Sequence, residues 1–137
     1  MNIDNLYYVK QNVLPHEYNM HKYVYGMNIV NTPEIISYDE INRIMTMRKI
    51  NNMCVSDMYG ENSEDIDEYL FDKIRHIIKT LYDNNIMYPD ITGYNFIEYD
   101  NKVWIIDFEH SKICNNIKNK FINKFINGLN QWNPEFK

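Results

Sequence analysis

The sequence predicts a single α+β domain in which a small β-sheet with one helix precedes a mainly helical part. Three observations predict this fold class. A chain of 137 residues, 45% apolar and 24% charged, is typical of one globular domain. Short β-like runs surround one helix signal in the first 50 residues. A strongly amphipathic stretch and a hairpin signal then follow.

The first part of the chain carries the sheet signals. Strands are expected at residues 6–11, 34–38 and 43–47. A helix is expected from Pro15 to Gly26, because proline suits the first helical position and glycine suits the C-terminal cap. A turn at 39–40 would join the last two strands. Residues 48–62 are polar and include Gly60, which predicts an irregular connection.

Residues 63–84 carry the strongest helix signal of the chain. Ser63 suits the N-cap, and acidic residues follow it where the helix dipole favours anions. Apolar residues then recur at helical spacing: Ile66, Leu70, Ile74, Ile77, Ile78 and Leu81. A second stripe of apolar residues at helical spacing runs from Ile117 to Leu129. Gly128 and Pro134 are expected to end this helix.

Between the two helix signals lies a hairpin signal. Residues 96–99 and 103–106 are short apolar runs separated by Asp100-Asn101-Lys102. Folding the chain at that turn would bring Asn95 near Asp107, with Asp90 on the loop that enters the hairpin. The sequence therefore predicts three oxygen-bearing side chains at one end of a rigid element.

These oxygen donors suit a hard cation. Mg²⁺ takes one or two carboxylates together with substrate phosphates, and Asn95 and Asp107 could serve as its ligands. Asp90 would then be free to act as a base toward a hydroxyl. The alternative is structural: Asp90 and Asn95 would cap turns, and Asp107 would end a strand.

The stretch resembles the catalytic core of the protein-kinase superfamily, in which H-x-D-x-x-x-x-N precedes a hairpin and D-F-G. "YPDITGYN" supplies Asp90 and Asn95, and "IIDFEHS" supplies Asp107 and Phe108. The form D-[IL]-T-x-x-N is similar to that of small atypical kinases, including the RIO group and the tRNA-modification-linked kinases. The resemblance implies that Asp90 is the catalytic base and that Asn95 and Asp107 are metal ligands.

The resemblance extends along most of the chain in the same order. "YYVK" resembles the strand of the phosphate-binding lysine, which implies that role for Lys10, with Glu17 as its helix partner. Met47 to Lys49 would be the hinge facing adenine. The implied fold is a minimal two-lobe kinase within one domain, residues 1–137. Its parts are a small lobe at 1–50, a connection at 51–62 and a reduced helical lobe at 63–137.

Several positions depart from the family pattern. Only nine residues precede Lys10, so the glycine-rich loop is missing, and 30 residues follow Asp107, which leaves most of the substrate-binding lobe out. Tyr88 and Pro89 replace the usual histidine and arginine. Glu109 replaces the usual glycine, and this D-F-E form resembles choline-kinase-like and aminoglycoside-kinase-like enzymes.

The function expected from this pattern is ATP-dependent phosphoryl transfer, with Mg²⁺ or Mn²⁺, to a protein serine or threonine hydroxyl. Two alternatives stay open. The chain could be a pseudokinase that binds a protein partner, or a small-molecule kinase of the choline-kinase type. The missing glycine loop and substrate lobe also favour an activating partner, or a second copy of the chain, that completes the site.

Charge, cysteine content and residue bias indicate which partners, which cellular location and which type of genome to expect. The net charge of -5 argues against direct nucleic-acid binding, which needs a basic face. Cys54 and Cys114 are too few and too far apart for a disulfide framework or a zinc site, and no secretory signal or membrane span is visible. An intracellular location is expected. Abundant asparagine and isoleucine, with no alanine, are typical of an AT-rich genome such as that of a large DNA virus or a parasite.

Overall fold

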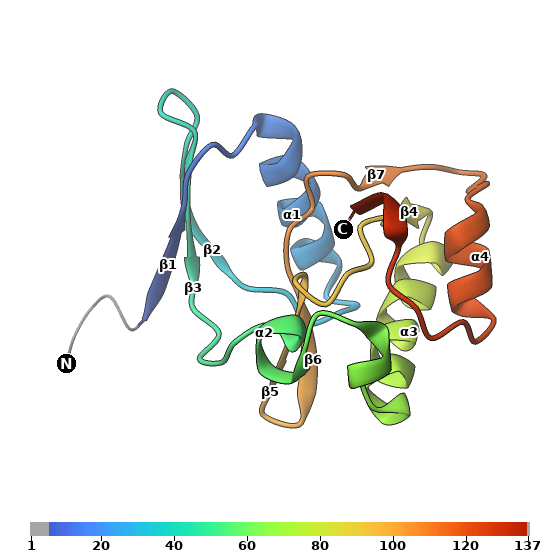
Figure 1. Cartoon of the computed structure of the whole chain (residues 1–137). Coiled ribbons are helices and arrows are strands. Elements are labelled where there is room, and N and C mark those ends of the chain that lie inside the picture. Colours follow the sequence, from blue (N-terminus) through green and yellow to red (C-terminus); the bar gives the residue numbers. More distant parts are fainter. Residues whose placement is uncertain (1–5, 137) are drawn as a thin grey trace.

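The computed structural model describes residues 6–136, which form two lobes with a helix between them (Figure 1). Residues 1–5 of the predicted small lobe and Lys137 of the helical lobe lie outside the described residues. The sheet lobe, meaning strands β1 to β3, lies at one side of the view, and helices α3 and α4 lie at the other. The predicted α+β class is confirmed.

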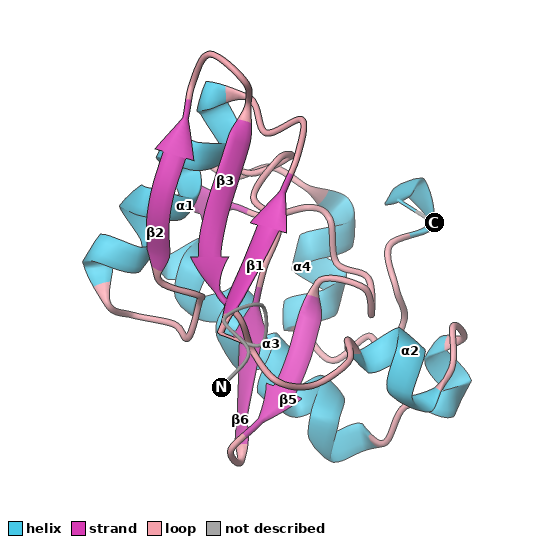
Figure 2. Cartoon of the chain, turned by 90° about the vertical axis from the view of Figure 1, so that its left-hand side faces the viewer, coloured by secondary structure: helices cyan, strands magenta, loops and turns pink. Residues whose placement is uncertain are grey.

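The sheet lobe is antiparallel, with strand order β1-β3-β2 (Figure 2). Its strands are β1 (Tyr7–Lys10), β2 (Ile35–Asp39) and β3 (Ile44–Arg48), all within about one residue of their predicted bounds. Val13, Met45 and Met47 form the buried cluster of this lobe, and Tyr18, Ile35 and Tyr38 pack against it.

Helix α1 (Pro15–Met27) begins at the predicted proline but ends later than expected. Gly26 was expected as the C-terminal cap, and this prediction is wrong: the glycine lies inside the helix. Asn28 takes the left-handed conformation at the end instead, with φ of 54°, and its N–H donates to the carbonyl of Tyr25. Asparagine tolerates that conformation better than most residues, which explains why Asn28 can end the helix where a glycine was expected.

The connection between the lobes is more ordered than its polar sequence indicates. Residues 48–62 were expected to be irregular, yet they contain helix α2 (Val55–Tyr59). Val55 and Ser56 are buried, because Val55 joins the large core and the Ser56 N–H donates to the carbonyl of Gly93 at 2.9 Å. Tertiary contact therefore overrides a weak local preference.

Helix α3 (Glu68–Asp83) starts five residues later than predicted. The assignment of Ser63 as the N-cap of this helix is wrong, because residues Ser63–Asp65 form a separate 3₁₀ turn. Ile66 is extended and buried in the core, and Asp67 after it takes the N-cap position of α3 without a side-chain capping hydrogen bond. The predicted apolar stripe of α3 is buried along its length.

The predicted hairpin forms from β5 (Phe96–Tyr99) and β6 (Lys102–Ile105). Its loop is the pair Asp100-Asn101, both left-handed with φ of 55° and 58°. Two left-handed residues are the requirement of a type I′ turn, which fits the twist of the strands. Lys102 therefore belongs to the strand, one residue earlier than expected. The backbone of Ile106 then donates to the carbonyl of Asn95 at 3.0 Å and closes the open end.

The remaining elements belong to the helical lobe. Helix α4 (Lys120–Ile126) is shorter than the predicted stripe and packs on α3. A short pair, β4 (Ile86–Met87) with β7 (Lys112–Ile113), was not predicted, and Pro134–Phe136 forms a 3₁₀ turn. The large core draws on α1, α3, α4 and the hairpin. None of the described helices has the length and apolar character needed to cross a membrane.

Candidate active site

A cleft of about 440 Å³ lies between the sheet lobe and the open end of the hairpin. Lys10, Met47 and Lys49 line it from the sheet side, and Asn95 and Asp107 line it from the hairpin side. Glu17 of α1 also lines it. Residues that lie far apart in the sequence thus line the same cleft.

Lys10 is the cation at the centre of this cleft. Its ammonium group pairs with the carboxylate of Glu17, and its Nζ lies 3.5 Å from Oδ1 of Asp107. Burial lowers the pKa of Lys10, but the hydrogen bond that Lys10 donates to Glu17 and the charges of both carboxylates outweigh burial, so its pKa is raised overall. Lys10 is therefore charged at neutral pH and links α1 to the residue that follows the hairpin.

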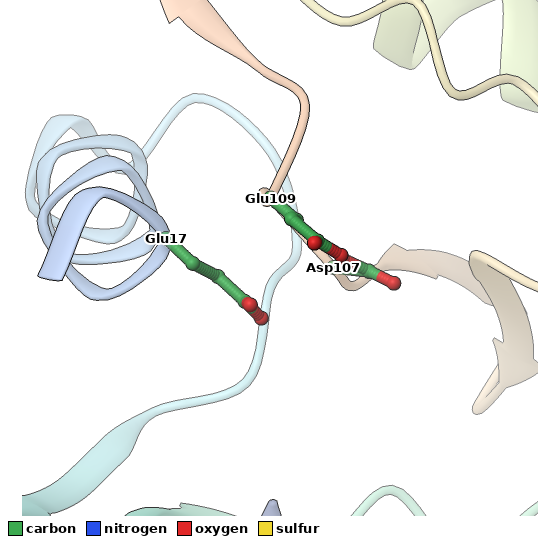
Figure 3. A group of neighbouring side chains, drawn as sticks. All are labelled: Glu17, Asp107 and Glu109. Atoms are coloured by element: carbon green, nitrogen blue, oxygen red, sulfur yellow. The ribbon is translucent and has the colours of Figure 1, made fainter. Parts of the chain in front are cut away.

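Glu17 lies in the first turn of α1 and is 4% exposed. Its pKa is raised, because burial and the nearby carboxylates of Asp107 and Glu109 outweigh the effect of Lys10. Figure 3 shows Glu17 reaching from α1, and Asp107 and Glu109 from the loop after β6. One oxygen from each of the three lies within 4.8 Å of the others. This crowding of negative charge is partly neutralised by Lys10.

Asp107 has a left-handed backbone conformation. Its φ is 65°, in a region that aspartate and asparagine adopt more readily than other residues with a side chain. The hydroxyl of the fully buried Tyr88 donates to the carbonyls of Ile106 at 2.6 Å and Asp107 at 2.8 Å. Tyr88, which stands where the kinase pattern has histidine, thus holds the backbone at Ile106 and Asp107 in place.

The loop from Asp90 to Asn95 carries the predicted base and one predicted metal ligand. The side-chain amide of Asn95 donates to the backbone carbonyl of Asp90 at 2.8 Å, which leaves the amide oxygen of Asn95 available to a cation. Burial raises the pKa of Asp90, and the charge of Asp107 adds to this rise while the Asn95 amide opposes it. A raised carboxyl pKa of this kind is typical of groups that exchange protons in catalysis.

A buried polar network connects α1 to the end of β6. The Nε2 atom of His21 lies 2.7 Å from the carbonyl oxygen of Pro33, and the Thr32 hydroxyl donates to the carbonyl of Ile105 at 2.8 Å. The His21 ring also packs on Phe108, with ring centroids 5.1 Å apart. Burial lowers the pKa of His21 to about 4, so the ring is neutral near pH 7. The Thr32 hydroxyl also lies 3.2 Å from Nε2 of His21, so the network ties α1 to the end of β6.

The structure brings most of the predicted residues into one cleft, and it places Asp90 on the adjoining loop. Sequence reasoning missed the contributions of Glu109 and His21. Glu109 was noted only as a replacement for glycine, and His21 carries no spacing signal that separates it from a solvated histidine. The oxygens of Asn95 and Asp107, which line the cleft, suit Mg²⁺, which prefers carboxylate and carbonyl ligands, and an oxygen of Glu109 lies within 4.8 Å of one of Asp107.

A two-lobed α+β fold with these groups around its cleft defines a kinase-like domain. The family model described as "RIO domain" matches residues 2–129, and the chain belongs to this family. The resemblance to the RIO group that the motifs indicated is confirmed.

Among solved structures, the chain is similar to the kinase PK-1 of the Cydia pomonella granulovirus, with a TM-score of 0.57 and 15% identity. The match covers 83% of this chain and 46% of that one, so the chain spans about half the length of the viral kinase. At this identity the likeness shows the fold alone. No curated protein matches the sequence.

Proposed function

We propose that the chain transfers the terminal phosphoryl group of ATP to a serine or threonine hydroxyl of a protein, with Mg²⁺ or Mn²⁺ bound. One observation carries the proposal: Lys10, Asn95 and Asp107 line one cleft, and the Asn95 amide fixes the loop of Asp90 beside it. Phosphoryl transfer needs mainly positioning and charge neutralisation, so a small scaffold suffices for the chemistry.

Each residue has a role that follows from its charge and place. Lys10 binds phosphate oxygens with its ammonium group, and the adenine ring lies beside Met47 and Lys49 on the sheet side. Asn95 and Asp107 hold the divalent cation, which neutralises phosphate charge when bound. Glu17 keeps Lys10 directed into the cleft through their ion pair.

The transfer itself exchanges one P–O bond for another. The bond between the terminal phosphorus and the bridging oxygen of ATP breaks, and a bond from that phosphorus to the substrate hydroxyl oxygen forms. The hydroxyl proton passes to the carboxylate of Asp90, which also orients the hydroxyl for attack. The raised pKa of Asp90 suits a group that accepts this proton.

Asp90→Asn tests the assignment. Turnover should fall by roughly 10² to 10⁴, which is the range for removing a general base. Nucleotide affinity should change little, because Asp90 is not assigned to the cation. Asn95→Ala should lower both turnover and metal-dependent affinity. Transfer of labelled phosphate to a generic protein acceptor is the assay, and equal small effects from both variants would favour the pseudokinase alternative.

A partner that completes the cleft is part of the proposal. Tyr8 of β1 lines the cleft and is 53% exposed, and Val9 on the same strand is 55% exposed. Such apolar exposure on a strand beside a cleft is consistent with contact to an activating protein or to a second copy of the chain. Light scattering over a concentration series measures self-association. A strict monomer with full turnover would contradict this part of the proposal.

A further inference from the structure

The C-terminal segment after α4 returns to the loop that carries Asp90. Figure 1 shows this segment, in dark red, leaving α4 and turning back toward the middle of the molecule. Trp132 anchors it: the residue is 3% exposed, and its ring packs on Phe71 of α3 with centroids 4.7 Å apart. The residue that follows, Asn133, is 2% exposed and lies against the loop.

Asn133 makes hydrogen bonds on both sides of Asp90. Its side-chain amide donates to the carbonyl of Pro89 at 2.8 Å, and its backbone N–H donates to the carbonyl of Ile91 at 2.8 Å. The carbonyl of Asp90 between them accepts from Asn95. Three consecutive carbonyls of the loop are therefore each bonded to an asparagine, two of them to Asn133.

The two hydrogen bonds of Asn133 hold a loop that has no regular secondary structure. Residues 88–95 form no helix or strand, so no regular backbone ladder sets the position of Asp90. Two hydrogen bonds from one buried residue fix the backbone on either side of it. Loss of the side-chain donor would leave the Pro89 carbonyl with the N–H of Ile91, 2.8 Å away, as its remaining donor, so the tie between the loop and the C-terminal segment on that side of Asp90 would be lost.

We infer that Asn133 is a positioning residue for phosphoryl transfer, because its two hydrogen bonds hold the loop of Asp90 at the distance the transfer needs. The inference rests on the proposed function. Asn133 is not among the residues that line the nucleotide cleft, so it acts on the proton-accepting side of the site alone. A displacement of about 1 Å at such a group can lower a rate by roughly 10²-fold.

Two variants and a neighbouring control separate positioning from general stability. Asn133→Leu keeps the approximate shape and removes the amide, and Asn133→Ser shortens the side chain beyond reach of Pro89. Trp132→Phe is the control, because the buried Nε1 of Trp132 has no hydrogen-bond partner among the described residues. The control keeps an aromatic ring beside Phe71 and breaks no hydrogen bond, while it removes part of the buried indole, so it reports the effect of lost packing in this segment.

The kinetic expectation is a split between turnover and binding. Both Asn133 variants should lower kcat by roughly tenfold or more while the dissociation constant for Mg-ATP changes less than about twofold. Trp132→Phe should leave both quantities unchanged. Equal kcat in the Asn133 variants and the parent, or an equal loss of nucleotide affinity, would overturn the inference.

Amide hydrogen exchange gives a reading that does not require activity. The amides of residues 90–95 should exchange roughly tenfold faster in the Asn133 variants, while those within α3 keep the parent rate. If the parent shows no phosphoryl transfer, the proposed function fails, and this exchange pattern still decides whether Asn133 holds the loop. Uniformly faster exchange across the chain, or failure of both variants to fold, would show a role in overall stability and overturn the inference.

Discussion

The sheet lobe and the helical lobe, whose described part is residues 63–136, are packed to very different extents. In the sheet lobe the buried cluster of the described residues is Val13, Met45 and Met47. The larger core draws on α3, α4, the hairpin and the loop between them. Helix α1 lies between the lobes, and its Met20 and Val24 belong to the larger core.

Because of this difference, one part of the candidate site lies on well-packed segments and the other part on a sparsely packed strand. Asp90, Asn95 and Asp107 sit on segments held by the large core and by buried hydrogen bonds. Lys10 sits on a strand with a small core, and its ion pairs with Glu17 and Asp107 tie it to the rest of the site. The side that we propose to bind metal is expected to be rigid, whereas the position of Lys10 depends on its ion pairs with Glu17 and Asp107.

The largest effect is expected from the large core. Phe71 is 1% exposed and contacts Phe125 and Trp132, so Phe71→Ala should lower the free energy of unfolding by about 3 to 5 kcal/mol. Urea denaturation measures this loss. Tyr69→Phe on the exposed face of the same helix is the control, expected within about 0.5 kcal/mol of the parent. A loss below 1 kcal/mol for Phe71→Ala would contradict the assigned core.

A smaller loss is expected from the sheet lobe. Met45 is 1% exposed but packs in a small cluster, so Met45→Ala should cost about 2 kcal/mol, at the low end for this substitution. Mg-ATP affinity should fall with it, because β3 supports the strand of Lys10. Urea denaturation and calorimetric titration measure the two quantities. A stability loss as large as that of Phe71→Ala would remove the difference between the lobes.

The ion pairs can be tested directly at Lys10. Lys10→Met should weaken Mg-ATP binding by roughly 10- to 100-fold, the range for removing a hydrogen bond to a charged group. Lys49→Met is the comparison, because Lys49 lines the same cleft but is exposed, and a change of less than about threefold is expected. Calorimetry gives both constants. Equal effects at the two lysines would show that Lys10 has no special contact with phosphate.

The pH dependence of turnover gives the smallest effect. In the proposed mechanism Asp90 accepts the proton only when it is ionised, and burial raises its pKa. Turnover should therefore rise with pH through a value above the ordinary aspartate pKa, and the residual rate of Asp90→Asn should lack this step. Rates measured from acidic to neutral pH show the step. An unchanged step in the variant would assign the titration to another group.

The sequence predicts the parts whose signals are local. The amphipathic stripe of α3, the Asp100-Asn101 turn and the pair Asn95 and Asp107 all follow from short patterns. The start of α3 could not be predicted, because burial of Ile66 overrides the capping preference of Ser63. The bonds of Asn133 to the Asp90 loop join residues more than 40 positions apart, and no short pattern encodes them.

The most direct test of the account is a titration of ATP with and without Mg²⁺ on the parent chain and on Asp107→Asn. At one hundred times the dissociation constant, Mg-ATP should stabilise the parent by about 2.7 kcal/mol and raise its melting temperature by roughly 9 °C. ATP alone should give almost no shift, because the crowded carboxylates of the cleft repel the triphosphate. Asp107→Asn should fold normally and lose the metal-dependent shift. No shift in the parent at millimolar Mg-ATP, or the same shift without metal, would contradict the assignment of this cleft as a metal-dependent nucleotide site.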